Sequence, residues 1–163
     1  MSPDRRAQGR ENRLLGKWGE ALFPVIQEAA ISWAVVSISP EEIDETDILK
    51  ARLKAMDLAI SKLEPPADFA LIDGNRDKGI TAPHATVIKG DSKSLNIAAA
   101  SILAKVSRDR HMLEMDKIYP QYGFAKHKGY PTKAHFDAIR QFGPSPIHRM
   151  TFLKKFYAQE GQS

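Results

Sequence analysis

The amino-acid sequence predicts an α/β fold, in which helices pack on a sheet that contains parallel strand pairs. Two observations lead to this fold class. Short apolar stretches typical of strands alternate along the chain with longer stretches of helical periodicity. The length of 163 residues also suits one domain with a core of its own. We therefore expect a single domain at residues 20–157, preceded by residues 1–19 and followed by a tail at residues 158–163.

The first elements are a helix and a strand. Residues 1–19 are polar and show no clear period, so we expect them to be poorly ordered or to form a frayed helix. Apolar residues recur at helical spacing from Glu20 to Ala29, with Pro24 placed in the first turn, where its missing amide does no harm. The apolar and β-branched stretch Trp33–Ile38 predicts a buried strand.

A helical region follows this predicted strand. Ser39, Pro40 and Glu42 form a helix start, with a capping hydroxyl, a proline at the first helical position and a glutamate three residues after the cap. One apolar stripe then runs across Asp47–Leu63 and predicts a helix that ends before two prolines.

The second half of the chain predicts two strands and two helices. Phe69–Ile72 and Thr86–Lys89 are short apolar runs that stop at turn signals. A long helix is expected from Ser94, because no glycine or proline interrupts the sequence before Pro120. A last helix is expected from Thr132 to Gly143.

Composition and charge narrow the function classes. The absence of cysteine excludes disulfides and thiolate metal sites, which favours hard cations such as Mg²⁺ or Mn²⁺ for any metal centre. Residues 89–157 hold thirteen bases against five acids, a net charge of +8, which suits a phosphate-facing surface but also suits simple solubility. No run of about 18 apolar residues and no apolar signal block is present, so we expect a cytoplasmic protein without membrane association.

Two aspartates occupy matching places after the predicted strands. Asp73 directly follows the first strand, and Asp91 follows the second with one glycine between. If the strands are neighbours, the two carboxylates can converge on one cation, although an aspartate after a strand also commonly caps a turn. Lys89, Ser92 and Lys93 add bases and a hydroxyl around Asp91, where a phosphate would be favoured and where helix capping is the alternative.

Two later segments mix aromatic, basic and imidazole side chains. The segment YGFAKHKGYPT is expected to form a glycine-punctuated loop. Its mixture of aromatic rings and cations suits stacking on a base or sugar and pairing with phosphate, but a surface loop with a buried aromatic or two explains it as well. Its residues of interest are Tyr122, Phe124, Lys126, His127, Lys128 and Tyr130. We do not expect His127 and His135 to bind a metal, because no third ligand lies at a diagnostic spacing. The segment GPSPIHRMTF, with His148 and Arg149, is expected to pack a C-terminal strand or arm.

Read in order, four segments resemble the successive motifs of ribonuclease HII. They are IDGN, IKGDSKSLNIAAASILAKVSRD, YPQYGFAKHKGYPT and GPSPIHRMTF. Weaker similarity before them extends the resemblance to roughly residues 20–156. The resemblance implies a ribonuclease H-like fold, with a mixed sheet flanked by helices, and hydrolysis of the RNA strand of RNA/DNA hybrids and of single ribonucleotides embedded in duplex DNA.

The resemblance also implies roles for individual residues. The family uses four acids with Mg²⁺ or Mn²⁺, and Asp73 of IDGN and Asp91 of KGDSKS match the third and fourth of them. Tyr130 of HKGY matches the tyrosine that packs at the RNA–DNA junction. Ser92 and Lys93 are implied to lie beside the phosphate. We expect Lys89 and Lys128 to bind substrate too, and we expect no obligatory protein partner.

One motif of the family has no counterpart here. The family opens with a strand that bears adjacent Asp and Glu and a glycine–arginine–glycine turn, typically DEAGRG, and residues 1–19 do not match it. We therefore expect a catalytic site and a sheet that are incomplete at the N-terminal strands, from a truncated product or a start placed too far downstream. The alternatives to an active nuclease are a catalytically dead nucleic-acid-binding remnant of the family and a phosphate-binding protein with a small-molecule substrate.

Overall fold

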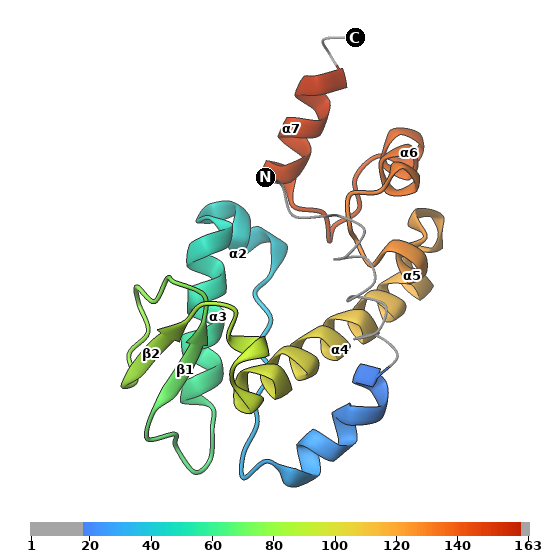
Figure 1. Ribbon diagram of the computed structural model, residues 1–163. Coiled ribbons are helices and arrows are strands. Elements are labelled where there is room, and N and C mark those ends of the chain that lie inside the picture. Colours follow the sequence, from blue (N-terminus) through green and yellow to red (C-terminus); the bar gives the residue numbers. More distant parts are fainter. Residues whose placement is uncertain (1–17, 161–163) are drawn as a thin grey trace. The chain divides into compact units, whose positions relative to one another are not determined.

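The computed structural model describes residues 18–160, apart from the side chains of residues 155, 159 and 160 (Figure 1). The expectation for residues 1–17 and for the last three residues therefore lies outside the described part of the chain. The described chain begins in a helix that includes residues 18–29. The further elements are α2 (Pro40–Glu45), α3 (Ile48–Ser61), β1 (Ala70–Asp73), β2 (His84–Val87), η1 (Gly90–Ser92), α4 (Leu95–Ile118), η2 (Pro120–Tyr122), α5 (Phe124–His127), α6 (Lys133–Phe142) and α7 (Met150–Glu160). Among the described helices, none is both long and apolar enough to cross a membrane.

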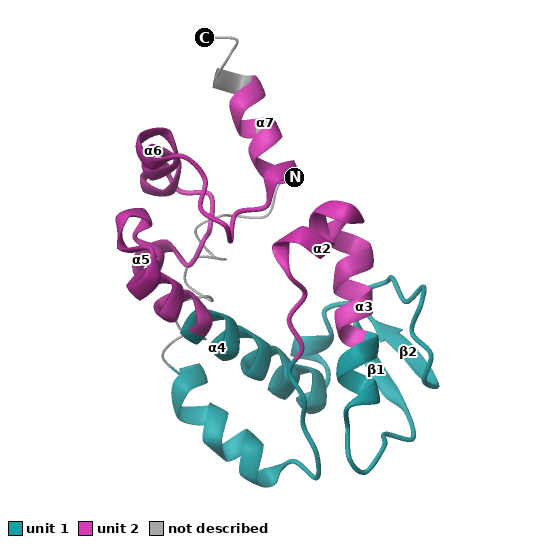
Figure 2. Ribbon diagram, turned by 180° about the vertical axis from the view of Figure 1, so that it is seen from behind, with its two compact units in different colours: residues 1–35, 57–110 teal, residues 36–56, 111–163 magenta. Residues whose placement is uncertain are grey.

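The described residues fall into two compact units (Figure 2). Unit 1 comprises residues up to 35 together with residues 57–110, and unit 2 comprises residues 36–56 together with residues from 111 onward. Helices α3 and α4 each contribute residues to both units. Each unit has a hydrophobic cluster of its own.

Unit 1 contains a two-stranded parallel sheet made of β1 and β2, seen side by side in Figure 1. Burial alternates along β1, so that Ala70 and Ile72 point into the unit and Asp73 is exposed. The register pairs Asp73 with Val87. The pairing of the two predicted strands is confirmed.

The bounds of both strands differ from the prediction. β1 extends to Asp73 itself, because the amide of Gly74 still donates to the carbonyl of Val87 (3.0 Å). β2 ends at Val87, two residues earlier than predicted, because Lys89 adopts a left-handed conformation (φ 54°) and leads into the single turn η1. A left-handed residue cannot continue a strand ladder.

The rest of unit 1 packs the first helix on the early part of α4. Phe23, Leu103 and Val106 form the buried cluster. A Cβ atom added at Gly19 would lie 2.9 Å from Cγ2 of Val106, so the two helices approach closely at a glycine. Arg110 lies over the ring of Phe23 at 4.4 Å from its centroid. The predicted first helix is thus confirmed, although it already includes residue 18, so Pro24 lies inside it and not in its first turn.

Unit 2 contains the larger aromatic cluster and most of the predicted helix caps. Its buried members are Met112, Tyr122, Phe124, Ala138, Ile139, Leu153 and Phe156. Ser39 caps α2 by accepting the amide of Glu42, and Thr132 caps α6 by accepting the amide of His135. These helices, the helix within Asp47–Leu63 and the long helix after Ser94 are confirmed.

Three structural expectations are wrong. Residues 33–38 form no strand in the described part of the chain, since a strand needs a neighbour and the described sheet holds β1 and β2 alone. The segment YGFAKHKGYPT is not an open loop: η2 and α5 bury Tyr122, Phe124 and His127 to 4%, 1% and 8% exposure, so these rings cannot stack on a ligand. Of the strand or arm expected at the C-terminus, the strand is wrong, because this segment forms the helix α7.

Candidate functional site

The candidate site lies in unit 1, where β1 and β2 end. The side chain of Asp73 is exposed, and its Oδ1 accepts the amide of Gly90 at 2.8 Å. Gly90 is buried, and a Cβ atom added there would lie 2.5 Å from Cδ1 of Ile97 and 3.2 Å from Oδ1 of Asp73. Glycine is therefore required at this position for the close approach of η1 to the end of β1.

Asp91 lies beside this contact, because it follows Gly90 directly in η1. Its side chain is exposed, and its Oδ1 accepts the amide of Ser92 at 2.9 Å. The hydroxyl of Ser92 in turn donates to the carbonyl of Lys89 (2.9 Å), and the amides of Lys93 and Ser94 donate to the carbonyl of Gly90. The turn after β2 is thus held by hydrogen bonds within itself and by one hydrogen bond to Asp73.

The donor set suits a hard divalent cation. The Oδ1 atom of each carboxylate accepts a backbone amide, and both aspartates are exposed. No group of three or more His, Cys, Asp or Glu side chains that could hold a metal exists among the described residues. Mg²⁺ commonly takes one or two carboxylates and completes its shell with water and substrate phosphate, so Asp73 and Asp91 fit such an ion.

Basic and hydroxyl groups flank the pair, as the sequence predicted. Lys89, Ser92 and Lys93 are all exposed and lie within two residues of Asp91. Cations beside a carboxylate pair can neutralise a phosphate that approaches the same edge.

The other two predicted substrate-binding residues, Lys128 and Tyr130, lie in unit 2. The ammonium of Lys128 donates to the carbonyl of Ala125 at 2.7 Å, which ties this cation to the end of α5. Tyr130 is 47% exposed, while its amide donates to the carbonyl of His127 at 2.8 Å. The backbone of Tyr130 is therefore fixed and its phenol is presented at the surface of unit 2.

Unit 2 also holds an imidazole cluster that sequence reasoning missed. His135 stacks on His127 with 4.3 Å between ring centroids, and its Nε2 lies 2.9 Å from Nε2 of His148. Burial lowers the pKa of His135 to about 4 and also lowers the pKa of His148, so both rings are neutral at neutral pH. No periodicity links residues 127, 135 and 148, and only the helical hydrophobic pattern of α6 could have indicated that His135 is buried.

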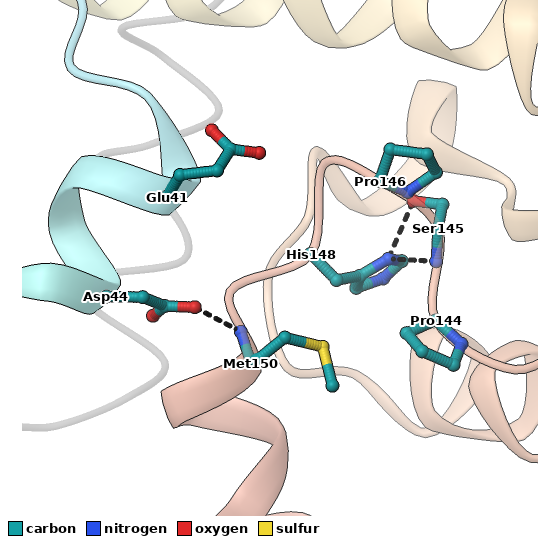
Figure 3. Close-up of a pocket in the computed structure, with 7 residues that line it drawn as sticks. All are labelled: Glu41, Asp44, Pro144, Ser145, Pro146, His148 and Met150. Carbon is teal, nitrogen blue, oxygen red and sulfur yellow. Dashed lines mark hydrogen bonds between the residues drawn. The ribbon is translucent and has the colours of Figure 1, made fainter.

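A cavity of about 360 Å³ in unit 2 is lined in part by His148 (Figure 3). Its lining residues are Glu41, Asp44, Pro144, Ser145, Pro146, His148 and Met150. Asp44, which is far from α7 in the sequence, caps this helix. Its carboxylate accepts hydrogen bonds from the amides of Met150 and Thr151 and from the hydroxyl of Thr151. These hydrogen bonds, the one from the Thr151 hydroxyl first, hold the pKa of Asp44 below its usual value. Of the two acids that line this cavity, Asp44 is therefore engaged in capping α7.

Comparisons with known proteins agree with the motifs. A family profile described as Ribonuclease HII matches residues 17–155. A protein named ribonuclease HII from Aliivibrio fischeri is 53% identical over 140 residues, which is 86% of this chain and 68% of that protein. A protein of the same name from Vibrio parahaemolyticus is 56% identical over 132 residues, 81% of this chain and 63% of that protein. The chain thus spans about two thirds of the length of these relatives.

A solved structure shares the fold. The crystal structure of the ribonuclease H2 from Pyrococcus horikoshii superposes with a TM-score of 0.68 at 23% identity, covering 87% of this chain and 79% of that one. The predicted α/β fold of the ribonuclease H-like type is confirmed by this likeness.

Proposed function

Because this chain belongs to the ribonuclease HII family of ribonuclease H enzymes, we propose that it hydrolyses the RNA strand of RNA/DNA hybrids and single ribonucleotides embedded in duplex DNA. The observation that supports this most is the pair of exposed carboxylates, Asp73 and Asp91, at the carboxyl ends of two neighbouring parallel strands. In α/β sheets this edge is where ligands bind.

In this proposal Asp73 and Asp91 are the catalytic carboxylates, and their Oδ2 atoms hold Mg²⁺ or Mn²⁺. When bound, such an ion supplies charge neutralisation at the scissile phosphate and an oriented water. Ser92, Lys93 and Lys89 bind the phosphate next to the pair. The hydrogen bond from Gly90 to Asp73 keeps the first carboxylate aimed at this edge.

Recognition of the substrate falls to unit 2 in the same proposal. The exposed phenol of Tyr130 packs at the RNA–DNA junction, where the 2′-hydroxyl distinguishes RNA from DNA. Lys128 stabilises the turn through its bond to Ala125 and adds positive charge beside Tyr130. The net charge of +8 over residues 89–157 supports binding of a polyanion.

The proposal also covers the domain, the location and the partners of the protein. Residues 20–157 act as one ribonuclease HII-like domain. The protein works in the cytoplasm, where its nucleic-acid substrates lie. It needs no obligatory protein partner for binding the duplex.

The test is incision of a labelled duplex that holds one ribonucleotide, with Mn²⁺, compared with the all-DNA duplex. We expect incision at the ribonucleotide alone. Asp73→Asn should lower the rate by at least about tenfold, since even the supporting partners of metal ligands are worth about that much. Asp68→Asn is the matched control, because Asp68 is an exposed acid shortly before β1 and outside the proposed site. An unchanged rate in Asp73→Asn would refute the metal assignment.

A second candidate function is non-catalytic binding of nucleic acid. The observation that favours it is the net charge of +8 over residues 89–157. Binding of both duplexes without incision at any Mn²⁺ concentration would favour this candidate. Competition by mononucleotides but not by duplexes would favour a small-molecule phosphate substrate over both.

A further inference from the structure

A backbone amide, two imidazole side chains and one carbonyl in unit 2 form a continuous line of hydrogen bonds that ends at Tyr130. The amide of Ser145 lies 2.9 Å from Nδ1 of His148. Nε2 of His148 lies 2.9 Å from Nε2 of His135, and Nδ1 of His135 lies 3.0 Å from the carbonyl oxygen of Tyr130. Figure 3 shows the first of these contacts, with the ring of His148 turned toward Ser145.

The two backbone groups at the ends of this line, the amide of Ser145 and the carbonyl of Tyr130, determine which atom donates in each hydrogen bond. A backbone amide can only donate, so Nδ1 of His148 accepts and the proton of this neutral ring lies on Nε2. That proton is donated to Nε2 of His135, whose own proton therefore lies on Nδ1. A carbonyl can only accept, so Nδ1 of His135 donates to Tyr130. Each ring is thus held in one tautomer.

The end point of the line is a residue whose backbone is unusually well held. Besides His135, the amide of Thr132 donates to the carbonyl of Tyr130 at 2.8 Å, and the amide of Tyr130 donates to the carbonyl of His127. The turn that leads to Tyr130 contains two left-handed residues, Lys128 (φ 51°) and Gly129 (φ 78°). A turn of this kind stays in place only where its surroundings determine it.

The third imidazole, His127, contacts the same turn. His127 accepts the amide of Gly129 at Nδ1 (3.2 Å), and its Nε2 lies 2.7 Å from the carbonyl of Tyr122, to which it donates. Its ring stacks on His135 with an interplanar angle of 20°. The buried rings therefore fix the backbone of Tyr130, while the residue itself is 47% exposed.

We propose that Ser145, His148 and His135 form a positioning relay that sets the place of Tyr130 for contact with the ribonucleotide junction. This inference rests on the function proposed above, in which Tyr130 touches substrate. None of the three relay residues is a catalytic residue; they act through the Tyr130 carbonyl.

The test measures discrimination, the ratio of the dissociation constants for the all-DNA duplex and for the duplex with one ribonucleotide, by fluorescence anisotropy. Tyr130→Ala should reduce this ratio, and His148→Leu should reduce it by about fivefold to tenfold, as expected for the loss of a hydrogen bond that aligns a contact. His148→Gln should retain most of the ratio, because its amide nitrogen can take the place of Nε2 and still donate to His135. His111→Leu is the control, since His111 is an exposed histidine on α4 outside the relay.

A role in folding alone is separated from positioning by two further measurements. The double variant His148→Leu/Tyr130→Ala should lose no more discrimination than Tyr130→Ala, whereas a folding role would lower the affinity for both duplexes. Nitrogen-15 spectra of the wild-type protein, which need no variant to fold, should show the proton of His148 on Nε2 and that of His135 on Nδ1.

The outcomes are distinguishable. A wild-type protein that does not discriminate between the duplexes overturns the proposed function and this inference together. A wild-type protein that discriminates, with full discrimination kept in His148→Leu or with the opposite tautomers, overturns the relay alone.

Discussion

Lowering the pH from 7 to 4.5 is expected to destabilise unit 2 through His135. Burial first, and then the neighbouring His127 and His148, lower the pKa of His135 from 6.5 to about 4. The unfolded chain therefore binds a proton at this residue between about pH 6.5 and pH 4, while the folded chain does not. Stability is fully present above pH 6.5 and falls as the pH drops through this window.

The magnitude follows from the pKa difference. A difference of one in pKa corresponds to about 1.4 kcal/mol, so full protonation of His135 costs about 3 kcal/mol, of which about 2 kcal/mol is expected at pH 4.5. His135 is 4% exposed, so solvent screens little of this cost. Protonation also places a second proton between His135 and His148, where each Nε2 atom would then be a donor. Paired acids of unit 2 such as Asp137, whose pKa lies below 3.8, contribute to pH dependence mainly below this window.

The chain offers a probe for each unit. All four tyrosines lie in unit 2 and both tryptophans lie in unit 1, so near-ultraviolet circular dichroism of tyrosine and tryptophan fluorescence follow the units separately. In urea unfolding followed by the tyrosine signal, the free energy of unfolding should be lower at pH 4.5 than at pH 7. In His135→Asn, whose amide nitrogen can still donate to Tyr130, stability should be lower at pH 7, and its loss between pH 6.5 and 4.5 should be clearly smaller than in wild type. The loss that remains comes from His148, whose pKa burial also lowers. Equal losses in wild type and variant, or no loss in wild type, would refute the reasoning.

Three other predictions concern local packing and caps. Gly90→Ala places a methyl group 2.5 Å from Ile97, so we expect a loss of about 1 to 3 kcal/mol in thermal unfolding together with weaker Mn²⁺ binding; an unchanged melting temperature would contradict the close approach. Asp44→Ala removes the cap of α7 and should lower the free energy of unfolding, followed by tyrosine circular dichroism, by about 1 kcal/mol. The free energy followed by tryptophan fluorescence should not change. Thr132→Ala should cost a similar amount and Thr132→Ser much less, because serine keeps the oxygen that accepts the amide of His135; equal losses would argue against the cap.

Local chemistry made much of the fold predictable. Ser39 and Thr132 cap helices with their own hydroxyls, and Gly143 ends α6 with a left-handed φ of 73°, so the start and stop signals of these helices lie within a few residues. The alternation of strands and helices also made a parallel strand pair predictable, whereas the sequence left open whether the strands before Asp73 and Asp91 are neighbours. The assigned chemical roles of Asp73 and Asp91 stay predictions.

The expectations that were wrong depend on distant residues. Trp33–Ile38 has the composition of a strand, but a strand forms only beside another. Tyr122 and Phe124 have the composition of a stacking loop, yet the packing of α6 and α7 buries them. His148 joins His135 across a proline-containing connection, and no spacing rule covers such a contact.

The central claim is that the ends of β1 and β2 bring Asp73 and Asp91 to one divalent cation, and substoichiometric Mn²⁺ tests it most directly. Paramagnetic broadening of backbone amide signals reports where the ion binds, whether or not the protein is active. We predict selective loss of the signals of Gly74 and of residues 90–92, reversed by excess Mg²⁺ and absent in Asp73→Asn. Broadening that begins at the acidic helix α2, or that leaves residues 90–92 sharp, would contradict the claim.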